Sequence, residues 1–211
     1  RWYENGQKEV ELGRKNGKLD GLITTWYENG QKKEEWNYKD GLEEGCVTHW
    51  YESGNKKEEG HFKNGYEDGR NTRWYENGQK EVELGRKNGK VDGLITMWYE
   101  NGHKREEGNY KNGKVEGLET CWYENGQKKS EVNFKNSKRD GVWVEWSSYG
   151  QKVSESNWKD GKEEGVDTHW YQTGQKWYEG NNKSGKKEGL WTWWYGYEED
   201  RQKERETNFK N

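Results

Sequence analysis

Hydrophobic and polar residues alternate in short runs along this chain, and glycine turns separate the runs. In residues 22–27 every second residue, ending with Trp26, falls on one side of an extended chain, and the others, ending with Tyr27, fall on the opposite side. Residues 94–99 repeat the same alternation. The pattern predicts β-strands that carry an aromatic residue on each face.

One Trp recurs every 24 residues along the whole chain, at Trp2, Trp26, Trp50, Trp74, Trp98, Trp122, Trp146, Trp170 and Trp194. In the second repeat we expect a strand over residues 22–27, a hairpin over 28–31 and a returning strand over 32–39. The hairpin contains Asn29-Gly30. This pair favours a two-residue type I′ turn, because both central residues of that turn need positive φ.

A second glycine turn, such as Asn16-Gly17 or Asp40-Gly41, leads from each repeat into the next. Consecutive hairpins should therefore join edge to edge. We predict an all-β fold, an elongated, twisted antiparallel meander of nine β-hairpin repeats, with residues 1–211 forming a single array. About seventeen or eighteen strands would give a ribbon roughly 80–90 Å long.

The recurring Trp rings are expected to be separated by a gap that another side chain must fill. Equivalent positions in successive repeats would lie about 9.6 Å apart, which is too far for one ring to touch the next. The Lys of each hairpin is placed to fill the gap with its aliphatic stem and its ammonium group. We therefore predict a structural ladder of alternating rings and lysines, built on Trp26, Trp50, Trp74, Trp98 and Trp122.

Composition alone is typical of a disordered chain, since only 26% of the residues are hydrophobic and 36% are charged. However, the net charge is −3 and aromatic residues reach 15%. A few large, flat side chains at fixed positions favour an ordered fold with a thin core. The near-neutral charge and the mixing of Lys with Glu argue against binding of nucleic acid, and no apolar run suits a membrane span.

The two cysteines, Cys46 and Cys121, stand three repeats apart. The strand spacing would separate them by roughly 29 Å, so they cannot form a disulfide within the predicted fold. Two unpaired thiols favour a reducing compartment, and we expect a cytoplasmic protein. An exposed Cys could also form a link between chains.

No constellation of residues indicates catalysis. The four His, at 49, 61, 103 and 169, are scattered, and a Glu recurs in eight repeats without singling out any pair. We expect this Glu to be a solvated cross-strand partner for Thr or Lys. The sequence thus predicts no catalytic residue, no metal site, no cofactor and no enzyme.

The recurring motifs of the repeat resemble those of a known family. The heptad WYENGQK, then a Glu and an aromatic residue, then YKNGK and a Gly, resembles the bacterial MORN variant repeats, which dominate the YwqK-type antitoxin component family. The likeness extends to all nine repeats and is strongest over residues 2–135. It implies an open, solenoid-like ribbon of hairpins and a cytoplasmic binding protein. MORN repeats elsewhere resemble scaffolds for proteins or lipids.

Three classes of function fit these observations. The first is a protein-binding array, an antitoxin or inhibitor that neutralises a toxin or effector through exposed aromatic residues. The second is a glycan or choline binder, since aromatic cages hold quaternary ammonium groups. The third is a structural spacer or lipid-associated scaffold. Association of one copy with another through the open end strands would be compatible with each class.

The repeat pattern departs most from its own rule after Asn136. Ser137 replaces a turn Gly, and the last hairpin is three residues longer than the others. Five of the six Trp outside the regular row also occur in this part. A polar C-terminal cap is one interpretation. Clustered aromatic residues with no core to enter favour another, an interface formed by Trp143, Trp177, Trp191, Trp193 and Tyr197.

Overall fold

The structure is a computed structural model that describes residues 1–196 and 202–210. All regular elements in these residues are β-strands, so the predicted all-β class is confirmed. The strands are antiparallel and belong to one open sheet of 19 strands. The chain divides into two compact units, unit 1 (Arg1–His103 and Tyr110–Gly113) and unit 2 (Lys104–Asn109 and the residues from Lys114 onward).

Unit 1 contains ten complete strands. They are β1 (Val10–Lys15), β2 (Lys18–Trp26), β3 (Lys32–Lys39), β4 (Leu42–Glu43), β5 (Gly45–Trp50), β6 (Lys56–Lys63), β7 (Tyr66–Glu67), β8 (Gly69–Trp74), β9 (Lys80–Lys87) and β10 (Lys90–Trp98). The short strands β4 and β7 each continue into the next strand after a break at Glu44 or Asp68. These two breaks explain why the strand count exceeds the predicted seventeen or eighteen.

Unit 2 follows the same order. Its strands are β12 (Lys114–Trp122), β13 (Lys128–Lys135), β14 (Lys138–Trp146), β15 (Lys152–Lys159), β16 (Lys162–Trp170), β17 (Lys176–Lys183), β18 (Lys186–Trp194) and β19 (Lys203–Phe209). Strand β11 (Lys104–Lys111) is divided between the two units.

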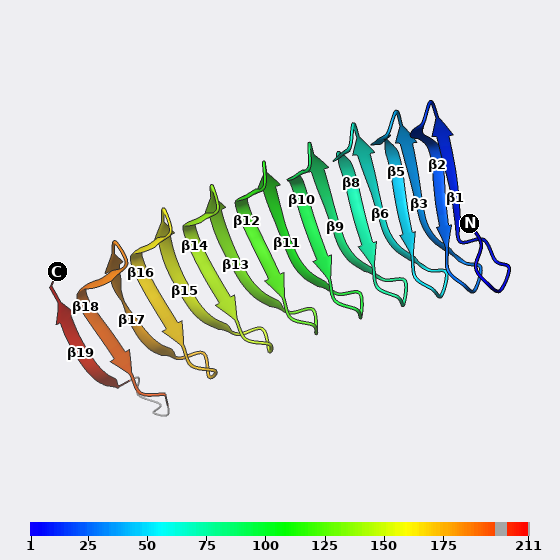
Figure 1. Cartoon of the computed structure of the whole chain (residues 1–211). Helices are drawn as coiled ribbons and strands as arrows, with labels where there is room; N and C mark the ends of the chain where they lie inside the picture. Colours follow the sequence, from blue (N-terminus) through cyan, green and yellow to red (C-terminus); the bar gives the residue numbers. More distant parts are fainter. Residues whose placement is uncertain (197–201, 211) are drawn as a thin grey trace. The chain divides into compact units, whose positions relative to one another are not determined.

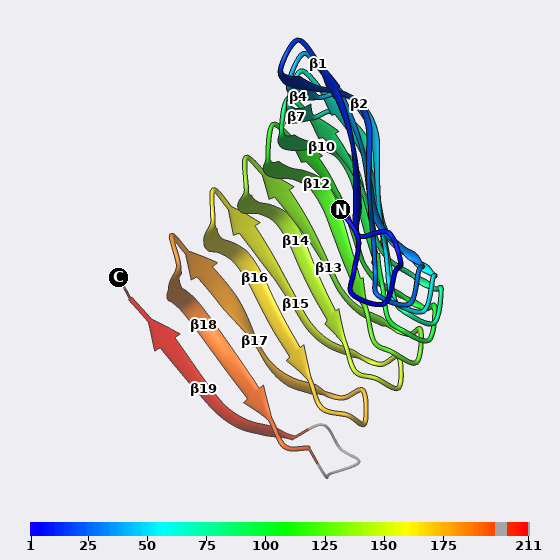
Figure 2. The same ribbon diagram turned by 45° about the vertical axis from the view of Figure 1, so that its right-hand side comes forward.

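Within each unit the strands form a meander in which strands that follow one another in the sequence pair side by side, with β4 and β5, and likewise β7 and β8, acting as one interrupted strand (Figure 1). Figure 2 shows strands β12–β19 as a single layer, and no other described element of unit 2 lies over either face. Neither face of this layer is therefore covered from within unit 2. The predicted length and overall ribbon shape stay predictions.

The two turns of each repeat have different backbones. At Asn16-Gly17 both residues have positive φ, 50° and 78°, and Lys15 pairs directly with Lys18. This turn is the two-residue type I′ turn, and it recurs at the equivalent Asn-Gly and Asp-Gly pairs. Ser137 keeps the conformation without glycine, with a φ of 62°.

The prediction of a type I′ turn at Asn29-Gly30 is wrong. Only Gly30 has positive φ, 86°. Its N–H donates to the Tyr27 carbonyl at 2.9 Å, and the Tyr27 N–H donates to the Gln31 carbonyl at 2.9 Å. These bonds define the longer hairpin loop in which a turn is followed by a left-handed Gly.

The side chain of Asn29 explains its recurrence at this turn. Its Oδ1 accepts the Gln31 N–H at 2.9 Å, and its Nδ2 donates to the carbonyl of Glu52 in the next repeat at 2.9 Å. Repeat three carries Ser53 here, and Asn55 makes the same inter-repeat bond from two positions further on. The residue thus stabilises its own turn and links it to the following one.

The two faces of the sheet carry different residues. The face called the regular face holds the recurring Trp, Lys, Glu and Thr of each repeat, as where Trp26 lies opposite Lys32. The variable face holds the residues between them, as where Ile23 lies opposite Trp36. The predicted alternation along each strand is present, and a bulge after Thr25 keeps Trp26 and Lys32 on the same face.

On the regular face, a Lys from each hairpin lies over the Trp of the next repeat. Lys32 Nζ is 5.5 Å from the centre of the Trp50 ring, and Lys152 Nζ is 5.6 Å from that of Trp170. Each such Lys also forms an ion pair with a Glu three residues on, as Lys152 does with Glu155 at 2.6 Å. The structure thus contains the alternation of rings and lysines expected between repeats.

Tyrosine hydroxyls join the same repeats at the backbone. Tyr27 Oη donates to the Trp50 carbonyl at 2.8 Å, and Tyr123 Oη donates to the Trp146 carbonyl at 2.9 Å. The recurring Tyr therefore fixes the spacing of the Trp row. A sequence without a conventional core uses such bonds, made afresh in each repeat, to hold its strands in register.

The core is two thin rows of buried residues, one on each face of the strand centres. Small hydrophobic residues such as Ile23, Val47 and Val132 form the row on the variable face, and Thr residues such as Thr24 form the row on the regular face. Neighbouring positions of the variable face complement each other in size. Gly60 lies beside Asn71, and Leu84 is paired with Ile95.

Candidate functional site

Aromatic residues gather at one place on the variable face of unit 2. We call this group the unit 2 cluster, and its rings are Trp177, Tyr178, Trp191, Trp193 and Phe209. They come from strands β17, β18 and β19. In earlier repeats the corresponding positions hold residues such as Lys33, Glu34, Ile23 and Thr25, so the cluster is built by substitution in a constant frame.

The rings form a continuous chain of contacts. The centroid distances are 5.1 Å from Trp177 to Tyr178, 5.8 Å from Tyr178 to Trp191 and 6.0 Å from Trp191 to Trp193. His169 stacks on Tyr178 at 4.4 Å. These spacings lie in the range of favourable aromatic pairs. The rings therefore hold one another in place.

Trp191 corrects one premise of the sequence analysis. We expected its ring to lack a core to enter, but its side chain is completely buried, at 0% exposure. The ring lies over Gly180, where a Cβ would approach it to 2.1 Å, and its Nε1 donates to the Asn181 carbonyl at 3.0 Å. Trp191 thus anchors the cluster and offers little surface to a partner.

Two cations lie over the rings of the cluster. Lys187 Nζ lies 4.0 Å from the centre of Trp191 and 5.2 Å from that of Trp193, and the Arg205 guanidinium lies 4.2 Å from Trp193. Both cations are exposed. Cation–π attraction fixes them on the rings, so the cluster presents positive charge already held in position.

Carboxylates lie beside the cluster and alter its titration. Burial, then the charges of Asp167 and Glu163, raise the pKa of Tyr178 to about 12. Burial and then Asp167 also raise the pKa of Glu163 above its ordinary value. Asp167 is buried, and His169 Nε2 stands 3.2 Å from its Oδ1 without the geometry of a hydrogen bond.

The structure brings together three of the five predicted interface residues. Trp177 is 44% exposed at the edge of the cluster, Trp193 is half-buried, and Trp191 lies beneath them. Trp143 is in a separate pair with Trp158, 5.7 Å away, with the Arg139 guanidinium 3.8 Å above its ring. Tyr197 lies outside the described residues.

A second group of rings, on the variable face of unit 1, was missed by the sequence analysis. This unit 1 cluster consists of Trp36, Tyr38, His49 and Phe62. Trp36 lies 5.2 Å from His49 and 5.9 Å from Phe62. The available signal was Trp36 itself, a Trp outside the regular row where repeats one and four carry Leu12 and Leu84.

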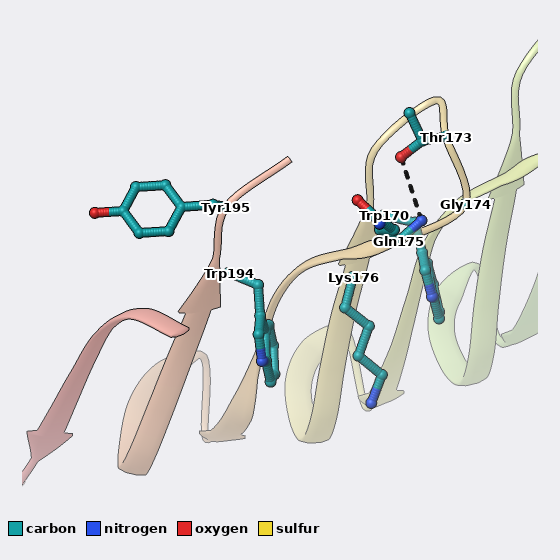
Figure 3. Close-up of a pocket in the computed structure, with 7 residues that line it drawn as sticks. All are labelled: Trp170, Thr173, Gly174, Gln175, Lys176, Trp194 and Tyr195. Carbon is teal, nitrogen blue, oxygen red and sulfur yellow. Dashed lines mark hydrogen bonds between the residues drawn. The ribbon is translucent and has the colours of Figure 1, made fainter. Parts of the chain in front are cut away.

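Unit 2 also contains a pocket of about 550 Å³ (Figure 3). It is lined by Trp170, Thr173, Gly174, Gln175, Lys176, Trp194 and Tyr195. Figure 3 shows Lys176 between the side chains of Trp170 and Trp194, with Tyr195 directed away from them. Thr173 replaces the usual turn Asn, and its Oγ1 accepts the Gln175 N–H at 3.5 Å.

Several other features bear on function. In the described part of the chain, no group of His, Cys, Asp and Glu is arranged to hold a metal ion. Cys46 and Cys121 are both free, as predicted. None of the residues described forms a helix of the length and apolarity that would cross a membrane. The recurring Glu pairs with Lys and with Thr, as where Thr168 Oγ1 donates to Glu179 at 3.1 Å.

The fold and its ladders define a β-hairpin repeat protein with one regular and one variable face. A family model described as MORN repeat variant matches four segments of the chain, residues 19–40, 43–64, 91–112 and 115–136. MORN repeats are generally non-enzymatic and are typical of repeat scaffolds. No curated protein was found to match the chain. MORN variant repeats are therefore present in four segments of the chain.

Proposed function

We propose that this protein is a non-catalytic scaffold that binds a protein partner through the unit 2 cluster. The observation that carries the proposal is Trp177, a Trp that remains 44% exposed at the edge of a fixed group of rings. Contact residues of this kind, large and held rigid, lose little entropy on binding. The regular face supplies the frame.

The chemistry of the cluster suits a protein surface with acidic and apolar groups. Lys187 and Arg205 offer positive charge above the rings, and Trp177 offers apolar area beside them. Aromatic residues and Arg are the residues most enriched in binding hot spots. The partner would therefore place a carboxylate near these cations and an apolar side chain against Trp177.

The finer proposal is an antitoxin or inhibitor that neutralises a toxin or effector in the cytoplasm. Its support is the likeness of the WYENGQK motif to YwqK-type antitoxin components, together with a binding cluster and no predicted catalytic group. A scaffold at a membrane or between proteins is the alternative that MORN repeats also support.

An affinity pull-down from the source cell tests this proposal. The test variant combines Trp177→Lys and Trp193→Thr, because Lys33 and Thr25 fill the equivalent places in repeat two and the fold accepts them. We expect the captured partner to bind at least tenfold more weakly to this variant, since each hot-spot residue contributes about 1–2 kcal/mol or more. Leu22→Thr, at a 46% exposed position of the regular face in repeat two, is the control and should bind normally. Equal binding by all three proteins would refute the proposal.

One observation favours a second function, the binding of a carbohydrate. The pocket in Figure 3 combines two Trp rings with the polar groups of Thr173 and Gln175. Lys176 beside the rings disfavours a choline-type cation there, because like charges repel. Binding of the parent chain to a glycan array would establish this function instead, if the Trp194→Ala variant loses that binding and the Trp177→Lys variant keeps it.

A further inference from the structure

The two aromatic clusters differ in their resident cations. In unit 2, Arg139 lies over Trp143 and Trp158, and Lys187 lies over Trp191. Among the residues that the structure describes, no Lys or Arg lies over Trp36, Tyr38 or Phe62 of unit 1. In the hairpins of this region, Lys33 and Lys57 lie instead over Tyr27 and Tyr51.

Carboxylates surround the rings of the unit 1 cluster. Glu34 Oε1 lies 3.7 Å from His49 Nδ1, Glu43 is paired in register with Tyr38, and Glu58 is paired with His49. All three carboxylates are half-buried. Burial, followed by the charge and hydrogen bond of Glu43 and the charge of Glu34, raises the pKa of Tyr38. The surroundings of the rings are thus anionic.

The neighbouring arginines of unit 1 are engaged elsewhere. Arg73 Nε forms an ion pair with Glu81 at 3.0 Å, and Arg86 Nε forms one with Glu67 at 2.9 Å. Arg73 is also the direct cross-strand neighbour of Glu58, whereas no Lys or Arg of the described residues forms an ion pair with Glu34 or Glu43. The unit 1 cluster therefore has the half-buried rings and carboxylates of a cation site without the cation.

We propose that the unit 1 cluster binds an arginine-bearing basic segment of a partner protein, with a guanidinium seated on Trp36 and Phe62 between the carboxylates of Glu34 and Glu43. A planar guanidinium suits the place because it stacks on aromatic faces and binds carboxylates in pairs.

The chain itself shows how such a group would sit. Residue 139 occupies in repeat six the position of Glu43 in repeat two, and its guanidinium lies 4.8 Å from Trp158, the counterpart of Phe62. In unit 2 this cation is supplied by the chain. In unit 1 the same position is acidic, so the cation must come from outside.

This inference extends the proposed scaffold function to a second surface of opposite charge. It uses residues of unit 1 only, so its failure would leave the unit 2 cluster and its own test unaffected. A second copy of the chain is the other occupant that an anionic aromatic surface could accept, and the experiment below resolves it.

The test measures binding of fluorescein-labelled octa-arginine to the full chain by fluorescence anisotropy. Trp36→Leu removes the ring but keeps the fold, because Leu12 and Leu84 occupy the same place in other repeats. Glu34→Gln removes one carboxylate of the site. Glu52→Gln, at an exposed turn, removes the same charge outside it and corrects for general attraction to a chain of net charge −3.

We expect Trp36→Leu and Glu34→Gln each to weaken binding about fivefold or more, the size of a cation–π contact or a charged hydrogen bond. Glu52→Gln should change it less than twofold. Glu43→Arg, which copies Arg139, should abolish binding, since it supplies a resident cation.

Three outcomes would overturn the proposal. The first is no binding of octa-arginine, and the second is equal weakening by Glu34→Gln and Glu52→Gln. The third is a wild-type chain that self-associates with rising concentration and loses that association on Trp36→Leu, which would make a second copy the occupant. Circular dichroism of each variant verifies that the fold is kept.

Discussion

The aromatic clusters of the two units both lie on the variable face of the repeat, yet they use mostly different repeat positions and their chemistry is opposite. The unit 2 cluster is anchored by the buried Trp191 and covered by Lys187 and Arg205. The unit 1 cluster is half-buried throughout and is surrounded by carboxylates such as Glu34 and Glu43. The repeat frame thus fixes where side chains stand, and a few substitutions on the variable face decide what they can bind.

Trp191→Ala, in the unit 2 cluster, should lower the stability of the protein the most. The Trp191 ring is completely buried over Gly180. Truncation would leave a space that neither the new Ala nor Gly180 could fill. We expect a loss of about 3–5 kcal/mol in the free energy of unfolding, measured by urea denaturation. Trp36→Ala in unit 1 should lose clearly less, because that ring is only half-buried. Similar losses would show that the two clusters are packed alike.

A paired substitution sharpens the same prediction. Trp191→Ile with Gly180→Leu copies the pair that Ile95 and Leu84 form in unit 1. Most of the stability lost in Trp191→Ala should return, since the two new side chains refill the space. Failure of the double variant to recover stability would mean that Trp191 contributes through something other than volume.

Truncating the Trp row should affect both units equally, because the regular face is the same in each. Lys80 lies 5.5 Å from the centre of Trp98 in unit 1, and Lys128 lies 5.7 Å from that of Trp146 in unit 2. We expect Trp98→Ala and Trp146→Ala each to lower the free energy of unfolding by about 2 kcal/mol, below the value for a fully packed ring. Trp98→Tyr should be tolerated. A melting temperature within a degree or two of the parent for Trp98→Ala would show that the row is not structural.

The turn asparagines should give a smaller effect, again alike in both units. Asn29→Ala removes the 2.9 Å bonds to Gln31 and Glu52, and Asn125→Ala removes those to Gln127 and Ser148. We expect each to cost about 1 kcal/mol, because exposed hydrogen bonds contribute modestly. Thermal melts of the two variants side by side measure this, and a difference between them beyond error would contradict a common frame.

The smallest effect concerns pH. Because the pKa of Tyr178 is raised to about 12, its neutral form is favoured by the fold. The stability it contributes is therefore fully present below the ordinary tyrosine pKa of about 10 and is lost as the pH rises through about 12. The difference in tyrosinate absorbance between the parent and Tyr178→Phe should show this late titration. Ionisation of Tyr178 near pH 10 would mean that neither burial nor the carboxylates beside it raise its pKa.

The sequence predicted the repeat, the strands and the alternation of faces because these depend on neighbours within a few residues. The conformation of Asn29-Gly30 was missed, since the same two residues suit two hairpin loops and only the pairing of Tyr27 with Gln31 distinguishes them. Burial of Trp191 was missed because it depends on Gly180, which lies on the adjacent strand.

The candidate sites were predicted less completely than the frame. Departure from the repeat rule led to Trp177 and Trp193, which do lie together in the unit 2 cluster. The unit 1 cluster was missed because its rings come from three strands, and only the register places Trp36 beside His49 and Phe62. The charges around each cluster depend on the same register, and the overall composition of the chain does not reveal them.

The central claim is that partners bind the variable face while the regular face holds the sheet together. Its most direct test is photo-crosslinking in the source cell, with a benzophenone amino acid placed either at Trp177 and Trp193 or at Trp50 and Trp74. Position 177 is exposed on the variable face, and positions 50 and 74 lie in the row of the regular face. We predict a defined crosslinked product from positions 177 and 193 and none from 50 and 74. Equal crosslinking from the Trp row would contradict the account, because the partner would then be reading the repeated face.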